Sequence, residues 1–173
     1  MLGRTANGLY WMFRFIERAE NTARLIDAGL RMSLTSMQGQ DEEWGSVLQS
    51  AGALSNYMAS HQEVTGPEVV NYLLREKDNS SSVMQAIEQA RSNGRMVRTG
   101  LTREAWEATN ECYLETKEQL RRRVSPAELP NVIDSIKQRC GLIRGAFHGT
   151  MLRNEIYNFA RIGTFIERAD NTA

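Results

Sequence analysis

The amino-acid sequence predicts an all-α protein, a compact bundle of six or seven helices. Two observations lead to this prediction. Apolar residues recur at steps of three and four positions, and no extended run alternates apolar and polar residues as a half-buried strand would. The chain also has only three prolines, and short polar segments separate its apolar-periodic stretches. Helices joined by short connections bury their apolar faces by packing into one bundle.

The first expected helix covers residues 5–34, because apolar residues keep helical spacing throughout this range. A weaker second helix contains two glycines and extends to Leu54. The remaining helices are expected to begin near Pro67, Val83, Thr102, Pro130 and Met151. Proline suits the first turn of a helix, and a threonine hydroxyl can cap one.

Size and charge narrow the class of protein. The 173 residues suit one domain with its own core, and 21 basic and 21 acidic residues give zero net charge, so no broad surface for nucleic acid is indicated. No apolar run reaches the roughly 20 residues of a membrane span, and no secretory signal opens the chain. Cys112 and Cys140 lack metal-ligand spacing and are typical of intracellular thiols. We therefore expect a single cytoplasmic domain over residues 1–173 that binds neither nucleic acid nor membrane.

A nine-residue segment occurs twice. Residues 15–23, Phe-Ile-Glu-Arg-Ala-Glu-Asn-Thr-Ala, return as residues 165–173 with one change, Glu20 to Asp170, which keeps the carboxylate. A helix needs only an apolar stripe and good helix formers, so the polar positions of a purely structural repeat could vary. Here the acids, the arginine and the amide repeat, which indicates a polar site built twice.

The first copy predicts one carboxylate inside the bundle and one at its edge. An α-helix turns about 100° per residue. This step places Glu20 in the apolar stripe of Ile16, with Glu17 and Asn21 on the flank, while Arg18 is expected to point elsewhere.

The second copy is expected to repeat this geometry. Asp170 would share the inward face of Ile162 and Ile166, Glu167 would lie at the edge, and Arg168 would point elsewhere. The candidate residues for a ligand site or polar network are therefore Glu17, Glu20, Asn21, Arg24, Glu167, Asp170 and Asn171.

Buried carboxylates need partners, because an unpaired one costs several kcal/mol or shifts its pKa. One interpretation is a structural polar network, in which Glu20 pairs with Arg24, Glu17 pairs with Arg14 or Asn21, and the two copies cross.

Two further interpretations remain open. The four acids Glu17, Glu20, Glu167 and Asp170 could bind a divalent metal such as magnesium or manganese, although no cofactor is required. Alternatively, the same acids and amides could recognise a peptide or another cationic ligand.

Outside the repeat, Arg91, Arg95 and Arg98 fall at helical spacing and form a candidate anion-binding row, because guanidinium binds carboxylate or phosphate with two parallel hydrogen bonds. A solvated helix face that makes ion pairs explains the same spacing. The chain contains no Gly-rich phosphate loop, nucleophile elbow, Cys-x-x-Cys pair or His-Glu-x-x-His motif. Independent enzymatic activity is therefore not supported.

Several stretches, taken in order, carry a family resemblance. They are residues 9–11, 14–25, 78–83 and 90–98, residues 104–107 with Asn110 and Tyr113, and residues 150–153 followed by the second copy of the repeat. On these stretches the chain resembles the bacterial alpha-E domain family, helical proteins named for their glutamate-bearing helices.

The resemblance implies a setting rather than a reaction. The family is a genetic companion of circularly permuted ATP-grasp proteins, which implies an ATP-grasp-type ligase as partner and amide-bond formation on peptides or proteins as the shared task. Members run beyond the second copy, so we expect this chain to be a C-terminally shortened form. The function predicted is a non-catalytic accessory domain; the alternative is a metal-dependent helical enzyme that uses the four acids.

Overall fold

The computed structural model describes residues 2–35 and 40–172 of the chain. This part contains eight α-helices, one short 3-10 helix and no β-strand, which confirms the all-α prediction. The helices are α1 (Leu2–Thr35), α2 (Gln40–Ser50), α3 (Leu54–Ser60), α4 (Gly66–Arg75), α5 (Val83–Met96), the 3-10 helix η1 (Arg98–Gly100), α6 (Arg103–Gln119), α7 (Leu129–Thr150) and α8 (Glu155–Asp170).

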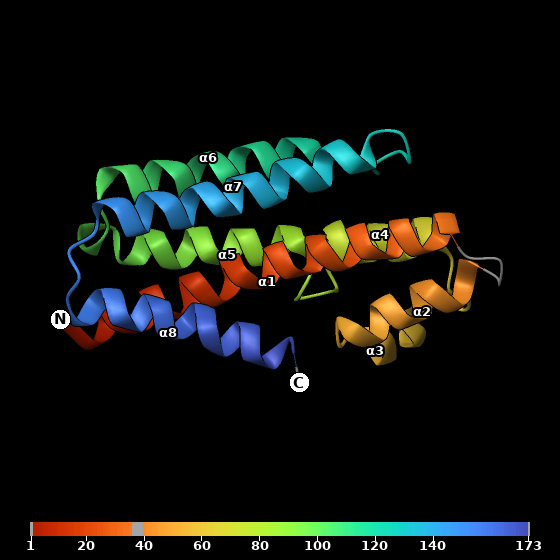
Figure 1. Ribbon diagram of the computed structural model, residues 1–173, viewed down its shortest axis with the longest axis horizontal. Coiled ribbons are helices and arrows are strands. Elements are labelled where there is room, and N and C mark those ends of the chain that lie inside the picture. The colour runs from red at the N-terminus through yellow and green to blue at the C-terminus, as the bar shows by residue number, and fades with distance from the viewer. Residues whose placement is uncertain (1, 36–39, 173) are drawn as a thin grey trace.

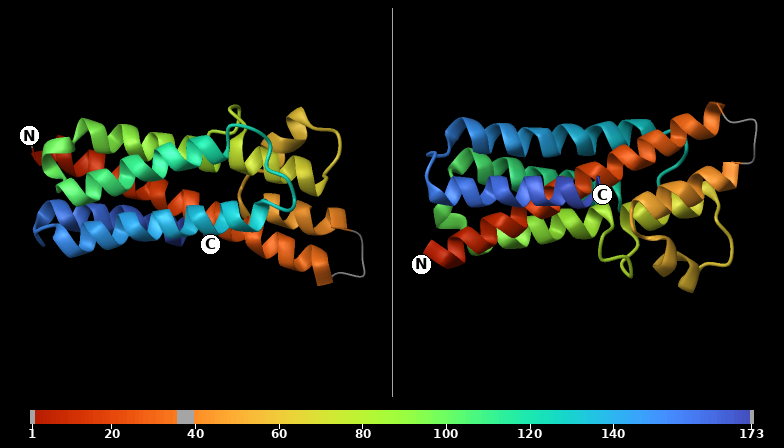
Figure 2. Two further views of the ribbon diagram at one scale, coloured as in Figure 1. Left: turned by 90° about the horizontal axis from the view of Figure 1, so that it is seen from above. Right: turned by 60° about the horizontal axis from the view of Figure 1, so that its bottom comes forward.

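Helix α1 is the longest helix and the centre of the bundle, where it contacts α5, α7 and α8 (Figure 1). Helices α6 and α7 form an antiparallel pair above α1 and α5. Helix α8 runs beside the first half of α1 in the same direction, so the two copies of the repeated segment become neighbours. Helices α2, α3 and α4 gather around the far end of α1, as both views in Figure 2 show.

Side-chain caps fix several helix starts. Thr102 caps α6 as predicted, since its hydroxyl accepts a hydrogen bond from the backbone N–H of Ala105. Ser82 caps α5 and Asn154 caps α8 in the same way. The expected start of the last helix near Met151 was therefore wrong by one turn, because the chain leaves α7 in an extended conformation and Asn154 sets the start at Glu155.

The expected second helix is divided in two, which accounts for a helix count above the predicted six or seven. Helix α2 ends at Ser50, and Gly52 adopts a φ of 63° before α3 begins. Left-handed backbone is strained for residues with a Cβ and routine for glycine, so Gly52 ends α2 sharply.

The core surrounds α1. Leu9, Met12, Phe13 and Ile16 are each no more than 1% exposed, and the ring of Phe13 lies 4.4 Å from that of Phe147 on α7. The apolar stripe predicted for the first helix therefore lies in the core as expected.

The described part of the chain has no helix both long and apolar enough to cross a bilayer.

Helix α8 buries a different face from the one predicted. Its buried residues are Tyr157, Ala160, Gly163, Thr164 and Glu167. Helix α8 packs mainly on α1, while Tyr157 stacks on Phe147 of α7. Gly163 allows the close approach, because a Cβ built on it would lie 2.2 Å from the carbonyl oxygen of Tyr10. The predicted inward face, with Phe159, Ile162 and Ile166, is 40–45% exposed. The prediction failed because it assumed that both copies are surrounded by helices, whereas α8 packs on α1 along one side only.

Candidate functional site

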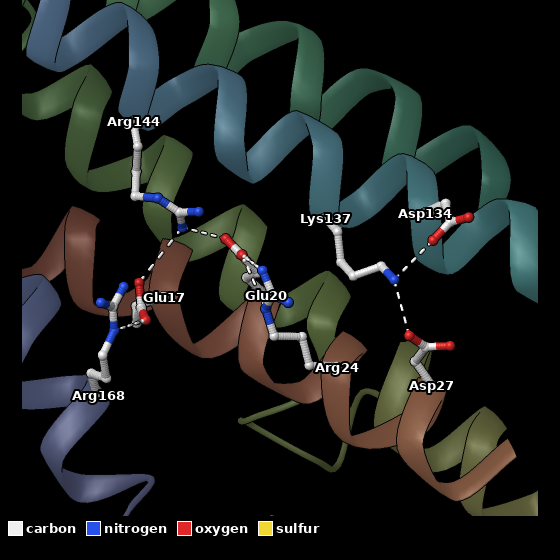
Figure 3. Close-up of polar contacts among 8 residues, drawn as sticks. All are labelled: Glu17, Glu20, Arg24, Asp27, Asp134, Lys137, Arg144 and Arg168. Carbon is white, nitrogen blue, oxygen red and sulfur yellow. Dashed lines mark hydrogen bonds and ion pairs between the residues drawn. The ribbon is translucent and has the colours of Figure 1, made fainter. Parts of the chain in front are cut away.

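The two copies of the repeat meet where α8 lies on α1, and they exchange ion pairs. Arg168 donates from Nε to Glu17 Oε1 at 2.8 Å, and Arg18 donates from Nε to Glu167 Oε1 at 2.6 Å (Figure 3 draws the first of these). Each copy therefore supplies the acid for the other copy's arginine. This is the internal counterpart of a two-fold symmetric interface, in which the same residues contact each other reciprocally.

Glu167 is the most buried acid of the network, with 2% of its surface exposed. It also accepts a hydrogen bond from Arg14 Nε at 2.6 Å and a second one from Arg18 Nη2 at 3.1 Å. Burial alone would raise the pKa of Glu167, but the hydrogen bonds from Arg18 and Arg14 outweigh burial and hold the pKa below its ordinary value. Glu167 is therefore ionised and saturated with donors at neutral pH.

Glu20 forms the second centre of the network. It lies inward as predicted, 5% exposed, and it accepts from Arg24 Nη2 at 2.7 Å, one helical turn along α1. Its other partner is Arg144, which reaches it from α7 (Figure 3). Burial would raise the pKa of Glu20, but the hydrogen bonds from Arg144 and Arg24 bring it below its ordinary value.

Glu17 connects the contacts of α7 with those of α8. Arg144 Nη1 lies 3.6 Å from Glu17 Oε2, so one guanidinium serves both Glu17 and Glu20, while Arg168 binds the other oxygen of Glu17. A separate bridge lies further along α1, where Lys137 Nζ is 3.0 Å from Asp27 and 2.8 Å from Asp134 (Figure 3). Ion pairs thus join α1 to both α7 and α8.

Asp170 does not take the inward position predicted for it. Its side chain is 59% exposed, and it contacts the guanidinium of Arg14 at the rim of the network. Asp170 lies about 60° around α8 from Glu167, and it is the last residue of the helix, where its side chain faces solvent. Glu20 and Asp170 occupy matching positions in the repeat but share no partner in the described chain.

The repeated amides also approach each other. Asn21 and Asn171 both line a cavity of about 60 Å³ beside Arg18, together with Asn79 and Ser81 from the connection that precedes α5. The structure therefore brings together Glu17, Glu20, Asn21, Arg24, Glu167 and Asn171 along one side of α1, with Asp170 at the edge.

Sequence reasoning missed three arginines of this site. Arg18 and Arg168 were expected to point elsewhere, and Arg144 was not considered. The signal for the first two was present, since the arginine of each copy repeats as strictly as the acid before it. The role of Arg144 depends on the packing of α7 against α1, which no local pattern reveals.

The candidate anion-binding row, Arg91 and Arg95 on α5 and Arg98 in η1, lies apart from this network. Arg91 donates to Asn110 Oδ1 at 2.8 Å and lies over the ring of Tyr113 at 4.6 Å. Arg98 lies over the ring of Trp106, and Arg95 is exposed. Arg91 thus joins α5 to α6, and Arg98 joins η1 to α6.

The network consists of ion pairs that link α1 to α7 and α8. Four carboxylates meet five guanidiniums, those of Arg14, Arg18, Arg24, Arg144 and Arg168. Charge-assisted hydrogen bonds of this kind fix the register and orientation of the helices they join. Within residues 2–35 and 40–172, no group of three or more His, Cys, Asp or Glu side chains is arranged to hold a metal ion.

The fold and the site together define an all-helical protein with an internally repeated helix that carries a Glu-Arg pair. Residues 1–173 match the model of the Alpha-E family, described as a predicted alpha-helical domain with a conserved ER motif. The chain belongs to the Alpha-E family. Glu17-Arg18 and Glu167-Arg168 are the two Glu-Arg dipeptides in its sequence, and they are the residues that exchange partners between α1 and α8. No curated protein and no solved structure matches the chain.

Proposed function

We propose that this chain is a non-catalytic helical interaction domain that acts in the cytoplasm with an ATP-grasp-type peptide or amide ligase. The observation that carries the proposal is the exposed apolar face of α8, formed by Phe159, Ile162 and Ile166. These residues lie three and four positions apart, as the contact residues of a docked helix do.

The repeat supports a helix as the partner of this face. Phe159, Ile162 and Ile166 stand 150 positions after Leu9, Met12 and Ile16, which are buried in α1. In α1 the equivalent face packs on α5, and a Cβ on Gly94 of α5 would lie 3.2 Å from Met12 Sδ. The same residue pattern on α8 therefore suits an amphipathic helix that, like α5, presents small residues to it.

The ion-pair network supports this role by holding the face outward. Glu167 binds Arg14 and Arg18 on the side of α8 that meets α1, which fixes the rotation of the helix about its axis. The four repeated acids are engaged by arginines of the same chain, so the network serves as scaffold and the apolar face as the contact. The ligase as partner rests on the family resemblance.

The test is to measure binding between the purified chain and the ATP-grasp-type protein encoded beside it by isothermal titration calorimetry. Phe159→Ser combined with Ile162→Ser should abolish binding and leave the circular dichroism spectrum and the melting temperature unchanged. The matched control is Leu114→Ser on α6, which is 54% exposed and lies outside the α8 face. Absence of binding by the wild type, or binding that tolerates the double substitution, would overturn the proposal.

A further inference from the structure

A cationic cavity lies on the side of α8 that faces the end of α7. Its volume is about 450 Å³, which falls within the range typical of small-molecule sites. Arg144 and His148 line it from α7, Arg153 from the connection, and Arg161 and Arg168 from α8. No carboxylate is among the described residues that line it, although the chain as a whole has no net charge.

Two of these arginines have no acidic partner. Arg144 and Arg168 pair with Glu20 and Glu17, but neither Arg153 nor Arg161 forms an ion pair within the described part of the chain. Arg161 lies over the ring of Phe165, 5.3 Å from its centre, and Phe165 also lines the cavity. The cavity therefore presents an excess positive charge from Arg153 and Arg161.

A second arginine-rich cavity provides a comparison. It shows that a cavity lined by arginines need not carry an excess of positive charge. Arg121, Arg122 and Arg123 line a cavity of the same volume near the start of α7. There Glu118 and Glu128 share the lining, and each pairs with one of these arginines. The charge in that cavity is compensated, so it offers no comparable attraction to an anion.

The positive charge around the first cavity affects the pKa of His148, which lines it. Burial lowers the pKa of its imidazole, and the charges of Arg161, Arg144 and Arg153 lower it further. Its Nδ1 lies 2.9 Å from the hydroxyl of Tyr157, which holds the ring in place. An anion in the cavity would relieve the repulsion among these groups.

We propose that this cavity binds the oligophosphate group of a small molecule. The uncompensated guanidiniums of Arg153 and Arg161 line the cavity together with the imidazole of His148 and the paired arginines. Two free positive charges suit a ligand with more than one negative charge, and the planar fork of arginine matches phosphate oxygens. The oligophosphate can be inorganic or part of a nucleotide, and the two sources are distinguished by the test below. This site goes beyond the proposed partner contact, which uses a different face of α8.

Isothermal titration calorimetry with inorganic triphosphate, ATP and adenosine tests the proposal. We expect both triphosphates to bind and adenosine not to bind. Tenfold tighter binding of ATP than of inorganic triphosphate would identify a nucleotide site, and equal affinities would identify a site for the phosphate chain alone. Affinity should fall steeply with added sodium chloride, because the attraction is between charges.

Arg153→Gln combined with Arg161→Gln should weaken triphosphate binding at least about tenfold, because two uncompensated charges are lost. Both side chains lie outside the ion-pair network, so the melting temperature without ligand should not change. The matched control is Arg121→Gln with Arg122→Gln in the compensated cavity, which should leave the affinity within twofold. The proposal is overturned if neither triphosphate binds at millimolar concentration, if the Arg153 and Arg161 variant binds as tightly as the wild type, or if adenosine binds as tightly as the triphosphates.

Discussion

Helices α1 and α8 carry almost the same nine residues, yet the bundle uses the two copies differently. In α1 the segment is enclosed by α5, α7 and α8, and its apolar stripe forms the core. In α8 the acid Glu167 is buried, and the equivalent apolar residues face outward. The Glu-Arg pair is the part that both copies use in the same way. The difference shows that the repeated polar residues determine how the helices meet, while the surroundings decide which apolar residues are buried.

The largest expected difference between the copies concerns their apolar residues. Ile16→Ala should lower the free energy of unfolding by about 2–5 kcal/mol, because it leaves a cavity in the core. Ile166→Ala, at the equivalent exposed position, should cost about 1 kcal/mol or less. Urea unfolding of both variants measures the two losses. Equal losses would mean that the α8 face is covered in solution, and sedimentation would then show whether a second copy covers it.

A second comparison sets the buried acid of the second copy against the exposed one. Glu167→Gln should cost about 3 kcal/mol, because Arg14 and Arg18 would lose the charge that compensates them at a buried position. Asp170→Asn should cost less than about 1 kcal/mol, as exposed ion pairs generally do. Thermal and urea unfolding of the two variants test this order. A reversed order would place the centre of the network at Asp170.

The pH dependence of stability sharpens the same comparison. The folded-state pKa of Glu167 lies below its ordinary value of 4.5, so this group contributes stability that is fully present above pH 4.5 and is lost as the pH falls through the folded-state pKa. The difference in unfolding free energy between wild type and Glu167→Gln should therefore be largest at neutral pH and shrink in acid. A difference that stays constant down to pH 3 would show that the lost charge is not its cause.

The helices were predictable from the sequence because periodicity and caps are local. The spacing of Leu9, Met12 and Ile16 is enough to predict α1, and the Glu20–Arg24 pair follows from a four-residue spacing on one helix. The break at Gly52 was underestimated, since glycine inside a helix is unfavourable but tolerated, and its positive φ depends on context.

The candidate site was predictable only in part. The repeat identified the acids, but the partners of Glu17 and Glu167 depend on which helix lies beside α1 and at what rotation. The inward position of Asp170 was wrong for the same reason, since an apolar stripe reveals the buried face only where another element covers it. Arg144 comes from a helix whose position against α1 is a property of the whole bundle.

The central claim is that the two Glu-Arg pairs exchange partners and so fasten α8 to α1. A double-mutant cycle of Arg18→Gln and Glu167→Gln, monitored by urea unfolding, tests it most directly. The control cycle uses Arg103→Gln and Glu107→Gln, an exposed pair within α6 at 2.6 Å. We expect a coupling energy above about 1 kcal/mol between Arg18 and Glu167, and about 0.5 kcal/mol or less in the control. A coupling between Arg18 and Glu167 no larger than that of the control would contradict the account.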